Sequence, residues 1–115
     1  MKTPQAAGKL GALAQETRLS IFRLLVQAGP AGMNAGAIAE AVGIPANTLS
    51  FHIAHLARAG LVVARQDGRF IYYSANYPAM DELLAFLTDN CCQGEGQCLP
   101  RTVAASTSKR RRPAA

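Results

Sequence analysis

Three cysteines lie close together near the C-terminal end of the chain, and their spacing points to a definite kind of chemistry. Cys91 and Cys92 are adjacent, and Cys98 follows across a segment that contains Gly94 and Gly96. Thiolates are soft ligands that select soft ions. Three sulfurs without a nearby His or a fourth Cys suit a three-coordinate ion better than tetrahedral zinc. We therefore predict that Cys91, Cys92 and Cys98 bind one soft ion within a single chain.

This site sets a condition on the helix before it. Consecutive side chains on an α-helix point about 100° apart, so Cys91 and Cys92 can share an ion only where the helix ends. An odd number of cysteines and an N-terminus without an apolar export signal argue against a secreted disulfide framework. Two alternatives stay open: a thiol redox switch, with a disulfide from Cys98 to Cys91 or Cys92, and a zinc or cadmium site.

Apolar residues at helical spacing predict the elements that position these thiols. Two runs of β-branched and aromatic residues, 61–66 and 69–74, predict strands, and Asp67-Gly68 between them predicts a type I′ hairpin turn. A helix pair with a hairpin directly after it is the winged form of the helix-turn-helix. The predicted fold is therefore mostly α with a small β-hairpin wing. The predicted helices are a short one around 10–14, then 16–28, 35–42, 46–59 and 78–90.

Composition and charge narrow the classes of function. The chain has 115 residues and a net charge of +5, but residues 1–100 are neutral, and the excess comes from Arg101 and residues 109–112. DNA binding by the folded part must therefore depend on local placement of charge. We expect one domain, 1–98, and a disordered basic tail, 99–115. The sequence has no run of about 20 apolar residues, no phosphate-cradling loop and no nucleophile with an evident base. We expect a cytoplasmic protein that is not an enzyme.

Taken together, these motifs resemble the ArsR family of winged helix-turn-helix metalloregulatory repressors, over about residues 8–98. The cysteines after the last helix resemble the arsenite-responsive branch of that family. The resemblance implies that As(III) or Sb(III) is the effector, bound by Cys91, Cys92 and Cys98, and that binding releases the repressor from DNA. Residues 35–42 contain no Cys and the last helix contains no His, so the ligand positions of other branches are absent. The matching stretches are AQETRLSI (14–21), TLSFHIAHL (48–56), AGLV (59–62) and GRFIYY (68–73).

The recognition helix and the wing supply the predicted DNA contacts. Short polar side chains near the start of a recognition helix reach base edges or phosphates in the major groove, and wing arginines reach phosphates. Ser50 could instead be a solvated residue, and either histidine a packed or surface imidazole. For Phe51, packing on its neighbours is preferred over contact with a thymine methyl group. The predicted DNA-binding set is Asn47, Thr48, Ser50, His52, His55, Arg65 and Arg69.

The apolar face of the last predicted helix has two interpretations, as intramolecular core or as a seam between subunits. In the ArsR family both terminal helices form the subunit interface, so the resemblance implies a homodimer. Such a dimer places two recognition helices about one DNA turn (~34 Å) apart and matches an inverted-repeat operator. The predicted interface residues are Leu10, Leu13, Met80, Leu83, Leu84 and Leu87.

Overall fold

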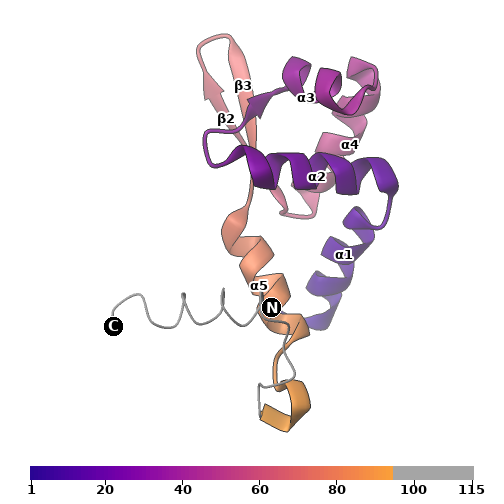
Figure 1. The fold of residues 1–115 in the computed structure, drawn as a ribbon, viewed down its shortest axis with the longest axis vertical. Coiled ribbons are helices and arrows are strands. Elements are labelled where there is room, and N and C mark those ends of the chain that lie inside the picture. Colours follow the sequence, from indigo (N-terminus) through magenta and orange to yellow (C-terminus); the bar gives the residue numbers. More distant parts are fainter. Residues whose placement is uncertain (95–115) are drawn as a thin grey trace.

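The computed structural model describes residues 1–94, which form helices around a three-stranded antiparallel sheet (Figure 1). Cys98, the predicted domain boundary and the predicted tail lie outside these residues. Within residues 1–94, none of the helices combines the length and the apolar character needed to cross a bilayer. The elements are α1 (Thr3–Leu13), α2 (Glu16–Ala28), β1 (Met33–Asn34), α3 (Ala35–Val42), α4 (Ala46–Arg58), β2 (Val62–Asp67), β3 (Phe70–Ala75), α5 (Tyr77–Leu87) and a 3₁₀ turn, η1 (Cys91–Gly94).

Local hydrogen bonds explain where the helices begin. Side-chain oxygens of Gln15, Asn34 and Asn76 accept hydrogen bonds from the backbone N–H groups in the first turns of α2, α3 and α5. These bonds satisfy donors that an α-helix leaves open at its N-terminus. The predicted bounds of the second and third helices are confirmed. The last helix was predicted too long: α5 ends at Leu87, three residues before Asn90.

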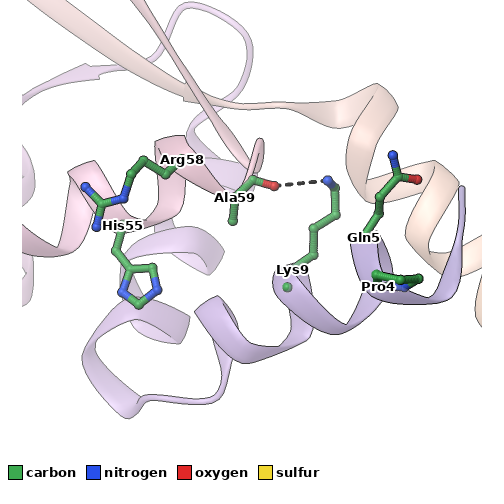
Figure 2. A pocket seen from close by; sticks show the side chains of 7 residues that line it. Pro4, Gln5, Lys9, His55, Arg58 and Ala59 are labelled. Atoms are coloured by element: carbon green, nitrogen blue, oxygen red, sulfur yellow. Dashed lines mark hydrogen bonds between the residues drawn. The ribbon is translucent and has the colours of Figure 1, made fainter.

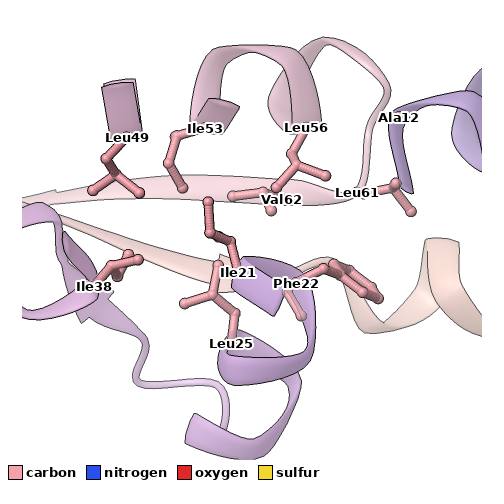
Figure 3. Packing of buried hydrophobic residues seen from close by; sticks show 11 residues of the cluster. Ala12, Ile21, Phe22, Leu25, Ile38, Leu49, Ile53, Leu56, Leu61 and Val62 are labelled. Atoms are coloured by element: carbon pink, nitrogen blue, oxygen red, sulfur yellow. The ribbon is translucent and has the colours of Figure 1, made fainter. Parts of the chain in front are cut away.

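The core forms where α2 and α4 face one another (Figure 3). Ile21 and Leu25 of α2 are fully buried, as are Leu49 and Leu56 of α4. Burying a large aliphatic side chain contributes about 1.5–3 kcal/mol, so this contact is a major contribution to the stability of the domain. The Leu19 side chain of α2 is 43% exposed and lies outside the core.

The sheet differs from the prediction in two respects. Its order is β1-β3-β2, and β1 was not predicted because two residues are too short to show a period. Asp67 pairs with Phe70, so the loop is Gly68-Arg69, one residue later than predicted. In this loop Gly68 has a positive φ (64°) and Arg69 does not. The predicted type I′ turn is therefore wrong, because that turn needs positive φ at both positions, whereas glycine at the first position suits type II′.

Two residues attach α5 to the rest of the fold. The Asn76 side-chain amide donates to the carbonyl oxygen of Gly60 at 2.9 Å. The Tyr77 hydroxyl donates to the carbonyl oxygen of Val26 at 2.9 Å. As a result α5 leaves the sheet on the side of α2 where α1 also lies, and the two terminal helices are in contact (Figure 1).

Gly32 provides a test of how closely β1 approaches β3. Both Gly32 and Gly43 have a φ of +79°, but a Cβ at Gly32 would lie 2.5 Å from the carbonyl oxygen of Tyr73, whereas Gly43 has open space. We predict that Gly43→Ala lowers the free energy of unfolding by about 1–2 kcal/mol, the cost of the left-handed backbone. Gly32→Ala should lose about 1–3 kcal/mol more through the clash. Urea denaturation of both variants measures this difference, and equal losses would contradict the close approach.

Candidate functional site

The predicted DNA-binding residues of α4 do not all face outward. Leu49, Ile53 and Leu56 direct one side of this helix into the core. Asn47 and Ser50 are exposed, while Thr48, His52 and His55 are each half-buried. The Asn47 side-chain oxygen also accepts a hydrogen bond from the backbone N–H of Thr48 at 2.9 Å, which leaves its amide N–H₂ group available.

His52 is held by a residue that the sequence analysis did not single out. An Arg18 guanidinium nitrogen lies 3.3 Å from Nδ1 of His52, and Arg18 Nε donates to the carbonyl oxygen of Ala12 at 2.7 Å. Since arginine is only a donor, Nδ1 accepts and the imidazole proton lies on Nε2. Arg18 therefore joins the end of α1 to the recognition helix. The sequence contained a clue to this contact of Arg18. A cation in the first turn of a helix opposes the helix dipole and needs a partner elsewhere.

A second basic region lies where the end of α4 approaches α1 (Figure 2). Here Lys9 Nζ donates to the carbonyl oxygen of Ala59 at 3.0 Å, beside a pocket of about 420 Å³ that His55 and Arg58 also line. Partial desolvation and then the charges of Arg18 and Arg58 lower the pKa of His55 below 6.5. The cationic side chains of Lys9 and Arg58 thus lie beside a His55 imidazole whose neutral form is favoured.

The two wing arginines have different surroundings. Arg65 donates to the carbonyl oxygen of Ala31 at 3.0 Å, lies 3.6 Å from a carboxylate oxygen of Asp67, and stacks 5.1 Å from the centre of the Tyr72 ring. The hydrogen bond to Ala31 connects the wing to the loop before β1, and the other two contacts lie within the wing. Arg69 lies in the exposed loop between the strands. Phosphate contact remains a prediction for both residues, and the geometry favours Arg69.

Phe51 and Arg58 lie on the outward side of α4, between Asn47 and His55 of the predicted set. Phe51 is 62% exposed, and its ring meets the His52 ring edge-on with centroids 5.4 Å apart. The preferred interpretation, in which Phe51 packs on its neighbours, is therefore wrong for most of its surface. Helical spacing from Leu49 and Ile53 could have revealed its outward direction.

The thiol pair lies where the helix has already ended. The Thr88 hydroxyl donates to the carbonyl oxygen of Leu84 at 2.8 Å and closes α5. Asn90, Cys92 and Gln93 all have a positive φ, which turns the chain sharply. The Cys91 sulfur atom lies 3.8 Å from that of Cys92, and Cys92 is disulfide-bonded in this structure. The turn therefore places the two sulfur atoms side by side.

The third predicted ligand, Cys98, lies outside the described residues. Within residues 1–94, no group of three His, Cys, Asp or Glu side chains is placed to hold a metal ion. The described part of the chain thus brings together two of the three predicted thiols.

An apolar groove of about 500 Å³ runs between α1, α2 and α5. Leu10 and Leu87 on its rim are exposed, whereas Leu83 is buried at its base. The structure therefore brings together all six residues predicted for a subunit interface, since each of them lines this groove: Leu10, Leu13, Met80, Leu83, Leu84 and Leu87.

Comparison with known proteins identifies the class. A helix-turn-helix domain family model matches residues 13–65, which include α2 to α4. The chain is 39% identical over 84 residues to the nodulation protein NolR of Rhizobium meliloti, covering 73% of this chain and 66% of NolR. It is 32% identical over 88 residues to the HTH-type transcriptional regulator YgaV of Escherichia coli, covering 76% of this chain and 87% of YgaV.

A solved structure extends the likeness to the wing. It is a homodimeric winged helix-turn-helix DNA-binding domain from Mycobacterium bovis, a possible ArsR-family regulator. The TM-score is 0.60 at 30% identity, over 84% of this chain and 89% of that one. Fold and relatives define a winged helix-turn-helix, DNA-binding transcriptional regulator and not an enzyme. The chain belongs to the ArsR family of these regulators.

The two wing arginines give a matched pair of variants. We predict that Arg69→Gln weakens binding to a random-sequence duplex and lowers the slope of log K against log salt by about one, because one phosphate contact is lost. Arg65→Gln should instead lower the free energy of unfolding by up to about 1 kcal/mol through the lost hydrogen bond to Ala31. Fluorescence anisotropy at several salt concentrations and thermal melting separate the two effects. Identical behaviour of the variants would contradict the assignment.

Proposed function

We propose that this regulator is a homodimeric repressor that binds an inverted-repeat operator and leaves it when As(III) or Sb(III) binds Cys91, Cys92 and Cys98. The observation that carries the proposal is that the sulfur atoms of Cys91 and Cys92 lie 3.8 Å apart just beyond the end of α5, where reduction of the Cys92 disulfide would make both sulfurs ligands. Trivalent arsenic and antimony are soft ions, which thiolates select. A free thiol has a pKa of about 8.5, so binding at neutral pH releases protons.

The backbone around the thiols supports a binding turn. Asn90, Cys92 and Gln93 lie in the left-handed region with φ between 52° and 59°. Non-glycine residues there cost about 1–3 kcal/mol each and persist where other interactions hold them. An ion that links the two sulfurs would stabilise this turn, and Gly94 and Gly96 lie between it and Cys98.

The apolar groove supports dimerisation through the terminal helices. A single short domain buries a limited share of its surface, and the groove leaves Leu10 and Leu87 exposed to water. A second copy of the chain would cover them, as the homodimeric relative from Mycobacterium bovis suggests. Two copies related by a two-fold axis match an inverted-repeat operator.

The location of the thiols suggests how the ion would act on DNA. Cys91 follows α5 by a few residues, and its backbone N–H donates to the carbonyl oxygen of Thr88, which closes that helix. Folding the turn around an ion would therefore change the end of α5 and the seam that α5 forms. The spacing or mobility of the two recognition helices would change with it. A difference in DNA affinity of about 1–3 kcal/mol between the two states would give a measurable response.

The arsenite response gives the direct test. We predict that arsenite releases the wild-type protein from its operator in a gel shift, and that Cys91→Ser, Cys92→Ser and Cys98→Ser each raise the required dose by at least about tenfold, because each removes one ligand. Gln93→Ser, in the same turn, is the matched control and should keep the wild-type response. Release of all three cysteine variants at the wild-type dose would contradict the proposal.

The same titration separates the alternatives. If zinc or cadmium releases the protein from DNA at lower doses than arsenite does, the protein is a broader soft-metal sensor. Mild peroxide, followed by mass spectrometry and a reductant, would reveal a thiol redox switch through a reversible disulfide. Either result without an arsenite response would replace the arsenite proposal.

The groove gives a second test. We predict that Leu87→Glu shifts the protein from dimer to monomer in analytical ultracentrifugation, because it would place a charge in an apolar seam. Val63→Glu, an equally exposed apolar position on the wing, is the control and should leave the dimer intact. A Leu87→Glu protein that remains dimeric at the same concentration would show that the groove is not the interface.

A further inference from the structure

We infer that Phe51 is a specificity-determining residue of the recognition helix and contacts the methyl group of a thymine in each operator half-site. The inference rests on the proposed operator binding and adds the base that this position reads. It starts from the exposure of Phe51, which at 62% exceeds that of the other exposed large hydrophobic side chains in residues 1–94.

The direction of the side chain follows from the core. Leu49, Ile53 and Leu56 are buried, and at about 100° per residue Phe51 lies roughly 140–160° around the helix from each of them. Phe51 therefore occupies the face of α4 opposite the core. It is the sixth residue of α4, in the N-terminal half that enters the major groove in helix-turn-helix proteins.

The apolar surface of Phe51 has no other evident use within the fold. The exposed side chains of Leu10, Leu19 and Leu87 gather at the groove between α1, α2 and α5, and Phe51 is not among its lining residues. The subunit seam proposed above would thus leave Phe51 uncovered. Of the groups that a base pair presents in the major groove, the thymine methyl is the apolar one, and phenylalanine is among the side chains that contact it.

One neighbouring side chain contacts the Phe51 ring. The His52 ring meets it edge-on at an interplanar angle of 69°, and Arg18 holds His52 through Nδ1 at 3.3 Å. An aromatic ring positioned in this way before DNA arrives loses less conformational freedom on binding than a free one would. Asn47, one turn earlier on the same face, is exposed and has amide donors available for an adjacent base edge.

Uracil differs from thymine only by the missing methyl group, so it tests the contact without changing any hydrogen bond. An operator is first selected from random duplexes with the full-length wild-type protein, and each thymine is then replaced by uracil. We expect one thymine per half-site at which uracil weakens wild-type binding about three- to tenfold, the effect of one buried methyl group. Phe51→Ala should bind the thymine operator more weakly and show no difference between thymine and uracil there.

Two further variants make the test specific. Phe51→Leu keeps an apolar side chain and should retain part of the thymine preference, whereas Phe70→Ala removes an exposed phenylalanine of the wing and should retain all of it. Thermal melting should show Phe51→Ala as stable as the wild type, since the ring is mostly exposed. The inference is overturned if no thymine methyl affects wild-type binding, or if Phe51→Ala keeps the full preference. Selection that enriches no sequence would overturn operator recognition itself, whereas a missing arsenite response would leave this inference intact.

Discussion

The apolar contact between α2 and α4 is the interaction on which the rest of this structure depends. Ile21 and Leu25 meet Leu49, Ile53 and Leu56, and this contact fixes the rotation of the recognition helix about its own axis. A rotation of one residue would turn Phe51 away from the outward face and a buried leucine into water. The core therefore determines which side chains of α4 are exposed to a binding partner.

Polar contacts then link the segments that lie around this apolar core. Arg18 joins α1 to His52, Arg65 joins the wing to Ala31, and Tyr77 joins α5 to the end of α2. Each is directional and links segments far apart in the sequence. They therefore add directional links between the wing, the recognition helix and the terminal helices to the apolar packing of the core.

The sequence predicted those features that depend on local periodicity. The bounds of α2 and α3 were correct because apolar spacing, an N-terminal cap and Gly43 all act within a few residues. The turn at Gly68-Arg69 was misplaced by one residue because Asp-Gly and Gly-Arg both suit a hairpin, and the register of β2 with β3 decides between them.

In the candidate site, too, some features were predicted from the sequence and others are seen only in the folded structure. Residue types and spacing alone led to the hypothesis that Cys91 and Cys92 act together, and it stays a prediction. What the structure adds is the end of α5 at Leu87 and the 3.8 Å between the two sulfur atoms. The sequence did not predict the hydrogen-bond partners of Arg65 and His52, because these partners, Ala31 and Arg18, each lie 34 residues away in the chain.

By itself, then, the sequence determined the bounds of α2 and α3, the presence of the wing and the clustering of the cysteines, since these depend on neighbours along the chain. Tertiary structure decided which face of α4 points outward, that Arg65 supports the wing, and that six apolar residues of α1 and α5 border one groove. Those outcomes depend on contacts between distant segments, and such contacts exist only once the chain has packed.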